Sequence, residues 1–152
     1  PAVLEDADLL EAVQDYVEHW CEQTELELHS DFDVNEAELS LAVKTCLFRI
    51  IQESLTNIYK HSQASAVGIS LKQRDGEVVL IIEDDGIGLK GASQESSGVG
   101  LGLRSMRERV ELLGGHLEIE SSQGRGTSIF VRIPLRRESG NEDGKAEDFT
   151  GR

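Results

Sequence analysis

The 152-residue sequence lacks several features that mark whole classes of proteins. It has no apolar run near the ~18–20 residues that a membrane-spanning helix needs, so we expect no direct membrane contact. Only two cysteines are present, Cys21 and Cys46, without a C-x-x-C pair, which favours two reduced, mostly buried thiols over a metal site. The chain opens without Met and without a leader pattern, so we expect no signal peptide and a piece of a longer protein.

Lys and Arg are absent from the first 43 positions, which contain thirteen Asp or Glu. The rest of the chain is close to neutral, with sixteen acids against fifteen bases, so the net charge of −14 arises almost entirely at the N-terminal side. Because affinity for nucleic acid depends on Lys and Arg that neutralise phosphates, we expect no nucleic-acid binding. The acidic segment is most simply the solvated surface of a helix.

Hydrophobic periodicity predicts three helices and about five strands. We expect helices at residues 8–23, from 35 onward and at 104–113, and strands near 26–28, 67–71, 78–82, 117–119 and 127–133. Capping-box patterns predict that the first helix starts at Asp8 and the second at Asn35. The order of elements indicates a two-layer α/β (α+β) sandwich with a mixed, mainly antiparallel sheet. The domain is expected at residues 1–135, followed by a disordered tail at 136–152.

The second helix carries a polar stripe beside a wide apolar face. That face consists of Leu39, Val43, Leu47, Ile50, Ile51, Ser54, Leu55 and Ile58. At ~100° per residue, the stripe gathers four side chains within about a quarter of the circumference: Glu53, Asn57, Lys60 and His61. A polar stripe is often only the side that faces water. An acid, an amide, an amine and an imidazole on one edge nevertheless make it a candidate functional surface.

The strand at 78–82 runs directly into a glycine-rich stretch, residues 84–103. Alternation places Asp84 on the same face as Leu80 and Ile82, where its carboxylate would be half buried. Such a group needs a ligand donor or a main-chain cap to offset its desolvation. Two glycine clusters follow and suggest a loop whose backbone approaches a ligand closely, although turn and capping roles explain isolated glycines equally well.

Three common phosphate-binding and catalytic patterns do not fit the sequence. A dinucleotide fingerprint needs glycine where Leu103 stands, and the P-loop ending Gly-Lys-Ser/Thr occurs nowhere. A nucleophile elbow is also missing. The ligand class therefore has to come from the combination of the remaining motifs.

Four motifs occur in order: Glu53-x-x-x-Asn57-x-x-Lys60-His61, Asp84-x-Gly86-x-Gly88, Gly98-x-Gly100-Leu101-Gly102-Leu103 and Gly126-Thr127. They resemble the N, G1 and G2 boxes of the ATP-binding (GHKL or Bergerat) fold shared by histidine kinases, Hsp90-type chaperones, type II topoisomerases and mismatch-repair ATPases. Within this superfamily, residues 1–135 are similar to the catalytic and ATP-binding domain of sensor histidine kinases. The segments 52–57 and 102–109 resemble the subfamily that includes nitrate/nitrite sensors, which pairs with helix-turn-helix response regulators.

The resemblance implies ATP and Mg²⁺ as ligands. It assigns Asp84 to the adenine amine with support from Thr127, and Asn57 to Mg²⁺, a cation that prefers oxygen ligands. Lys60 and His61 would meet the phosphates, and Glu53 would lie near the γ-phosphate and polarise the nucleophile or a metal-bound water.

The glycine boxes would form the rest of the nucleotide site. Residues 89–99 become an ATP lid, and the glycines around it would let the backbone approach the nucleotide: Gly86, Gly88 and Gly98. A helix start would offer main-chain N–H groups to phosphate from Gly100, Leu101, Gly102 and Leu103. Asp85 departs from the family pattern, which often has Asn there. Its carboxylate would increase dependence on Mg²⁺ if it faced the phosphates and would have no effect if it faced solvent.

The implied activity is transfer of the ATP γ-phosphoryl to a histidine on a separate dimerisation helix of the full-length protein, for relay to a response regulator. The domain would be cytoplasmic, in a protein that can be anchored in the inner membrane. The phosphoacceptor is not evident in this chain. Two alternatives remain: an anti-sigma-factor protein-serine kinase, which shares the fold, and a nucleotide-sensing module without transfer activity. Intact Glu53, Asn57 and Lys60 argue against the second.

Overall fold

The computed structural model describes residues 8–88 and 99–135, with side chains described from 102 onward in the second range. The elements are α2 (Leu9–Thr24), β1 (Glu27–Asp33), η1 (Glu36–Glu38), α3 (Leu41–Asn57), η2 (Ile58–Ser62), β2 (Ala66–Arg74), β3 (Glu77–Asp84), α5 (Val99–Leu112), β4 (His116–Ser122) and β5 (Gly126–Pro134). Gly98, most of the predicted lid and the predicted tail lie outside the described residues.

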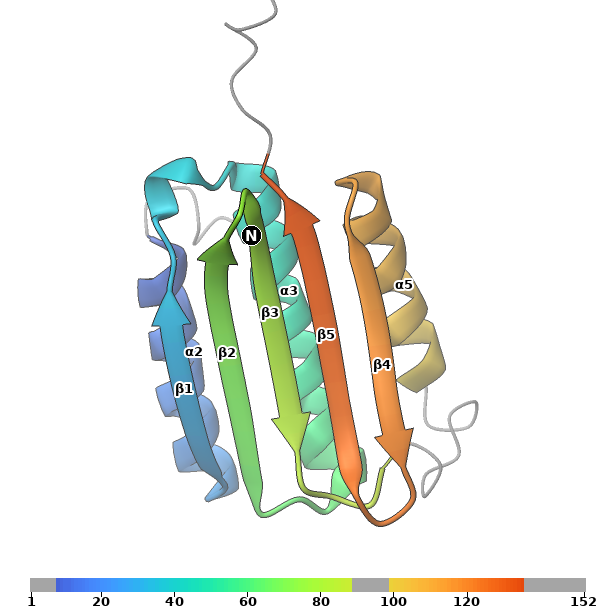
Figure 1. Ribbon diagram of the computed structural model, residues 1–152. Coiled ribbons are helices and arrows are strands. Elements are labelled where there is room, and N and C mark those ends of the chain that lie inside the picture. The colour runs from blue at the N-terminus through green and yellow to red at the C-terminus, as the bar shows by residue number, and fades with distance from the viewer. Residues whose placement is uncertain (1–7, 89–98, 136–152) are drawn as a thin grey trace, which may run out of the picture.

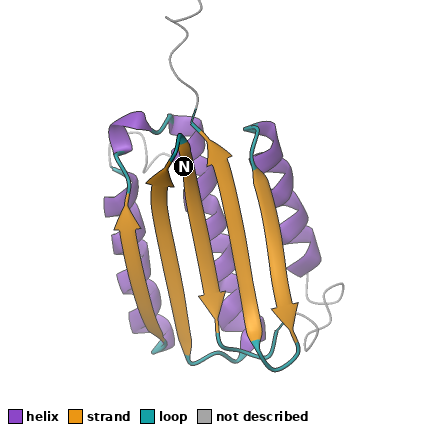
Figure 2. Ribbon diagram, viewed as in Figure 1, coloured by secondary structure: helices purple, strands orange, loops and turns teal. Residues whose placement is uncertain are grey.

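The five strands form one sheet in the order β1-β2-β3-β5-β4. β1 pairs with β2 in parallel, and the other three pairs are antiparallel. α2, α3 and α5 cover one face of this sheet, as Figures 1 and 2 show. The predicted sandwich, with three helices on a mixed and mainly antiparallel sheet, is therefore confirmed. None of the helices in the described ranges is long and apolar enough to cross a membrane.

α3 and its extension η2 supply the centre of the core. Every residue predicted for the apolar face of this helix is buried, and Ser54 is the one polar member of that set. The helix packs against the inward face of the sheet, where Val78, Leu80 and Ile82 of β3 are 0–1% exposed. Burial of a large apolar side chain contributes ~1.5–3 kcal/mol, so this packing fixes which edge of the helix meets the end of β3.

The start of α2 corrects the first predicted capping box. The Asp8 side chain makes no capping hydrogen bond. Instead the main-chain N–H groups of Leu9 and Leu10 donate to the Glu36 carboxylate at 2.6 and 2.9 Å. An acceptor 27 residues away replaces the local one because the fold brings η1 beside the start of α2.

The other two long helices also begin at positions that differ from the predictions. Asn35 caps only the 3-10 turn η1, by accepting from the Ala37 N–H, and α3 begins at Leu41 behind a separate cap, Ser40. α5 starts at Val99, five residues before the predicted start. Asn35 and Ser40 are both good cap residues, and the glycines at the start of α5 disfavour a helix, which explains the two differences.

Both predicted hairpins are confirmed. The β2–β3 turn places Asp75 and Gly76 at φ 52° and 77°, the left-handed conformations that a two-residue hairpin turn needs. The pairing of β3 with β5 puts Asp84 directly opposite Thr127. The C-terminal ends of α3 and β3 and the start of β5 thus lie at the same end of the sandwich.

Candidate functional site

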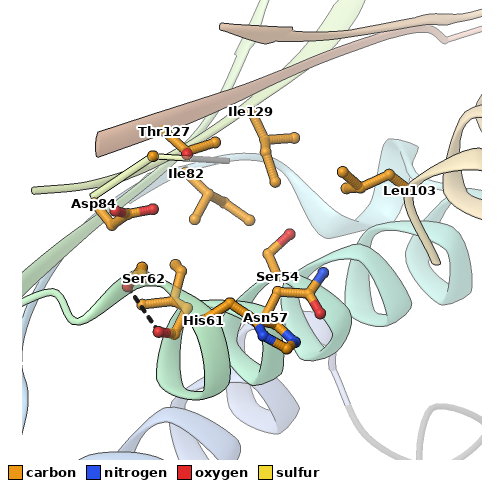
Figure 3. Close-up of a pocket in the computed structure, with 11 residues that line it drawn as sticks. Ser54, Asn57, His61, Ser62, Ile82, Asp84, Leu103, Thr127 and Ile129 are labelled. Carbon is orange, nitrogen blue, oxygen red and sulfur yellow. Dashed lines mark hydrogen bonds between the residues drawn. The ribbon is translucent and has the colours of Figure 1, made fainter. Parts of the chain in front are cut away.

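A pocket opens between the end of α3 and the sheet. It is lined by Ser54, Asn57, Ile58, His61, Ser62, Ile82, Asp84, Gly88, Leu103, Thr127 and Ile129. Four large aliphatic side chains form its walls, and a few polar groups converge on it (Figure 3). Apolar walls with a few convergent polar groups are typical of pockets that bind small organic ligands.

Asp84 lies at the sheet side of this pocket, where the sequence predicted a half-buried carboxylate. Its Oδ1 accepts a hydrogen bond from the main-chain N–H of Gly86 at 2.8 Å, which is the predicted main-chain cap. Burial raises the pKa of the Asp84 carboxyl; the N–H groups of Gly86 and Thr127 lower it, and the charge of Asp85 raises it further. The ionised form is thus only partly compensated by the protein, and a ligand that donates a hydrogen bond would stabilise it.

Thr127 lies beside Asp84 on the neighbouring strand and also lines the pocket. Its Oγ1 is 3.0 Å from Oγ of Ser121, so the two hydroxyls form a hydrogen bond. This bond fixes the rotamer of Thr127 next to the carboxylate. Its supporting role toward a ligand stays a prediction.

The helix side of the pocket contains two polar atoms without partners. Oγ of Ser54 and Nδ2 of Asn57 are buried and have no hydrogen-bond partner among the described residues. An unpaired buried polar group costs about 1–3 kcal/mol, which natural cores seldom retain without a reason. Both groups project from α3 into the space below the sheet (Figure 3).

The helix changes to π geometry directly after Asn57, in η2. Single π-turns occur frequently at functional sites. His61 lines the pocket, whereas Lys60 is exposed and does not line it. Neighbouring residues of a helix point about 100° apart, so one of the last two members of the stripe can line the pocket while the other faces solvent. Their contacts with phosphate remain predictions.

Glu53 lies outside the pocket, against the first turns of α5. A Cβ added at Gly102 would come within 2.8 Å of a Glu53 carboxylate oxygen, so the glycine permits this approach. The backbone of Gly100, Leu101, Gly102 and Leu103 is helical, which places their N–H groups at the predicted helix start. The structure thus brings the predicted acid beside the predicted anion site, and Leu103 also forms a pocket wall.

Gly86 and Gly88 have a packing role within the chain. A Cβ at Gly86 would collide with the main chain of Ser62, and one at Gly88, where φ is 84°, would collide with the carbonyl oxygen of Ser122. Only glycine fits at either position, whatever the ligand. Their direct contact with a nucleotide therefore stays a prediction.

Asp85 points away from the pocket. Its Oδ1 accepts from the main-chain N–H groups of Ser65 and Ala66 at 2.8 and 3.1 Å, and the side chain is exposed. These bonds, first that from Ala66, lower the pKa of the Asp85 carboxyl. Asp85 therefore binds main-chain N–H groups at the start of β2 and is not part of the pocket lining.

Sequence reasoning missed part of the site. The aliphatic walls Ile58, Ile82 and Ile129 were assigned to the core, and Ser54 was counted with the apolar face of its helix. The available signal was a serine within an otherwise apolar face, one turn before Asn57.

Comparison with known proteins gives the family. The family model described as "Histidine kinase-, DNA gyrase B-, and HSP90-like ATPase" matches residues 42–137. The chain is 40% identical over 137 residues to the signal transduction histidine-protein kinase/phosphatase UhpB of Salmonella typhimurium, covering 90% of this chain and 26% of that protein. It is 32% identical to the sensor histidine kinase LiaS of Bacillus subtilis, covering 94% of this chain and 39% of that protein.

Solved structures show the same fold. The histidine kinase domain of the Erythrobacter litoralis EL346 blue-light activated histidine kinase matches with a TM-score of 0.69 at 20% identity, over 84% of this chain and 61% of the other. Acinetobacter baumannii histidine kinase AdeS matches with a TM-score of 0.63 at 18% identity, over 85% of this chain and 64% of the other. The predicted fold is thus found in histidine kinases.

Proposed function

The chain belongs to the family of histidine kinase-, DNA gyrase B- and HSP90-like ATPases. We propose that it is the cytoplasmic ATP-binding catalytic domain of a sensor histidine kinase. The chain spans only 26% and 39% of the two curated relatives described above, so the acceptor histidine and the regulator partner would lie elsewhere. The observation that carries the proposal is the incompletely compensated carboxylate of Asp84 in a pocket with aliphatic walls.

The adenine ring would occupy the space between α3 and the sheet. Its exocyclic amine would donate to the oxygen of Asp84 that Gly86 does not occupy, with Thr127 beside it. The aliphatic walls would contact the faces of the ring and remove about 25 cal/mol per Å² of apolar surface from water. A base with a carbonyl in place of this amine would place its carbonyl oxygen against the Asp84 carboxylate. Both groups are hydrogen-bond acceptors, so such a ligand should bind more weakly.

The triphosphate would extend toward the gap between the end of α3 and the start of α5. The amide of Asn57, whose Nδ2 has no partner among the described residues, fits a Mg²⁺ site, because its oxygen and nitrogen exchange by rotation about one bond and Mg²⁺ prefers oxygen ligands. When bound, the ion would neutralise phosphate charge. The first N–H groups of α5 would hold phosphate oxygens, with Lys60 and His61 closing the near side.

Phosphoryl transfer would then depend on position and charge more than on covalent chemistry by this domain. Glu53, held against Gly102 at the start of α5, would orient and polarise the incoming imidazole of the acceptor histidine. The acceptor would be supplied by the dimerisation helices of the same protein, and the phosphoryl group would pass on to a response regulator. No role in binding nucleic acid is proposed.

The test is calorimetric titration of Mg²⁺-ATP into wild type, Asp84→Asn and Asp85→Asn. In Asp84→Asn the amide oxygen can still accept from the Gly86 N–H, but an NH₂ group replaces the carboxylate oxygen that faces the adenine amine. ATP affinity should therefore fall on the order of 10- to 100-fold. Asp85→Asn is the matched control one residue away and should bind as wild type. Equal affinity in all three proteins would disprove the adenine contact.

The transfer step is tested with the full-length protein and ATP labelled at the γ-phosphate. Label on histidine is lost in acid, and Asp84→Asn should reduce it while Asp85→Asn should not. Acid-stable label would instead identify a serine kinase. Binding without any label would identify a nucleotide-sensing module.

A further inference from the structure

Ser54 is the one polar side chain within the buried face of α3, and its relative exposure is 0%. The residue lies one turn before Asn57, and its Oγ has no hydrogen-bond partner among the described residues. Figure 3 shows this hydroxyl directed from the helix toward Ile82 and Ile129, into the pocket.

A second buried serine in the same pocket shows how unusual this is. Ser62 Oγ donates to the carbonyl oxygen of Ile58 at 2.7 Å and accepts from the Ala64 N–H at 3.1 Å. This is how helical serines normally satisfy themselves, by bonding to the carbonyl four residues earlier. The Ser54 hydroxyl makes no such bond within the described ranges, so Ser54→Ala should stabilise the ligand-free fold.

The two walls of the pocket offer opposite hydrogen-bonding chemistry. Asp84 lies on the sheet side, and its ionised carboxylate can accept hydrogen bonds but cannot donate them. It therefore requires a hydrogen-bond donor on the ligand. Ser54, on the helix side, has an O–H that can donate, and it can read an acceptor. Adenine carries both kinds of group, an exocyclic amine and ring nitrogens.

We propose that Ser54 is a specificity-determining residue that donates a hydrogen bond to an acceptor nitrogen of the purine ring. This inference rests on the proposed nucleotide-binding function and adds a second contact to the base. A flat apolar slot with Asp84 alone would select any planar ligand that presents an amine. The hydroxyl of Ser54 adds the requirement for a ring nitrogen at a fixed position.

The first experiment compares Ser54→Ala with Ser62→Ala in ATP affinity and in the thermal unfolding of the nucleotide-free protein. Ser54→Ala should weaken ATP binding about three- to tenfold, the loss of one neutral hydrogen bond, and should raise the unfolding temperature. Ser62→Ala removes bonds that the chain makes with itself, so it should lower the unfolding temperature. Unchanged ATP affinity in Ser54→Ala would overturn the inference.

The second experiment identifies the atom, using ATP analogues in which N1, N3 or N7 is replaced by C–H. The penalty of Ser54→Ala should persist with two analogues and disappear with the third, whose missing nitrogen is the one that Ser54 reads. Ser62→Ala is the control, since any penalty it causes should be the same for ATP and all three analogues. An equal penalty of Ser54→Ala with all three overturns the inference. If wild type fails to bind ATP at all, the proposed function fails as well, and this outcome is distinguishable.

Discussion

The two ends of the sandwich treat their polar side chains differently. At the η1 end, near the top of Figure 1, side chains bind main-chain and side-chain groups of other elements. Glu36 accepts from Leu9 and Leu10, and Gln73 connects Asn35 with Glu38. At the pocket end, Ser54 and Asn57 each have a buried atom without a hydrogen-bond partner in the described part of the chain.

The difference separates polar residues that hold the fold from those available to a ligand. Glu36 and Asp84 are both partly buried acids, but two N–H groups from α2 bind both oxygens of Glu36. Asp84 is left with burial as the largest influence on its pKa. A partly buried carboxylate whose hydrogen-bonding capacity is not filled by the protein is a better marker of a binding site than burial or charge alone.

The largest expected effect concerns the backbone that shapes the pocket end. Gly86→Ala places a Cβ against the main chain of Ser62, which cannot move like a flexible side chain, so unfolding free energy should fall by about 3 kcal/mol. Gly68→Ala, in β2 with no atom within 4 Å of its added Cβ, is the matched control and should be stabilising by ~0.5–1 kcal/mol. Urea denaturation measures both. Equal changes in unfolding free energy for the two variants would show that the backbone around Gly86 can move to accept a Cβ. Its packing against Ser62 would then not define the pocket.

At the other end, Glu36→Ala should lower the free energy of unfolding by about 1–2 kcal/mol, the usual cost of a lost helix N-cap. The start of α2 would lose the acceptor for two N–H groups. Glu38→Ala is the control in the same short helix, because its carboxylate binds only exposed side chains and should cost less. ATP affinity, measured in parallel, should not change in either variant. A loss of affinity in Glu36→Ala would contradict the separation of the two ends.

The parts of this molecule set by local pattern were predictable from sequence. The apolar face of α3, the Asp75–Gly76 hairpin and the half-buried position of Asp84 each follow from a period of 3.6 or 2 and from turn chemistry. The cap on α2 was not predictable in this way, since its acceptor lies 27 residues along the chain.

The site was predicted as a set of residues but not as a geometry. The predicted stripe spans about a quarter of the helix circumference, and of its last two members only His61 lines the pocket. Ser54 was hidden because a lone serine on an apolar face has the same period as its neighbours. Only the structure shows that its hydroxyl lacks a partner among the described residues.

The smallest effects test the contrast between Asp84 and Asp85 through pH. Burial raises the folded-state pKa of Asp84, so its favourable contribution to stability is complete only below the unfolded pKa, about 4, and is lost as pH rises through the folded value. Asn cannot ionise, so Asp84→Asn should be more stable than wild type at pH 7 without nucleotide. This advantage should disappear as pH falls below about 4.

Asp85 should behave in the opposite way. Main-chain bonds lower its folded-state pKa, so its contribution is present above the unfolded value and is lost as pH falls through the folded one. Asp85→Asn should therefore be slightly less stable than wild type at pH 7, with the difference vanishing in acid. Urea denaturation of the three proteins at pH 7 and pH 3.5 gives both signs. If Asp84→Asn and Asp85→Asn shifted stability in the same direction at pH 7, the two carboxylates would not differ in pairing, and Asp84 would lose its distinction as the acid that the fold leaves for a ligand.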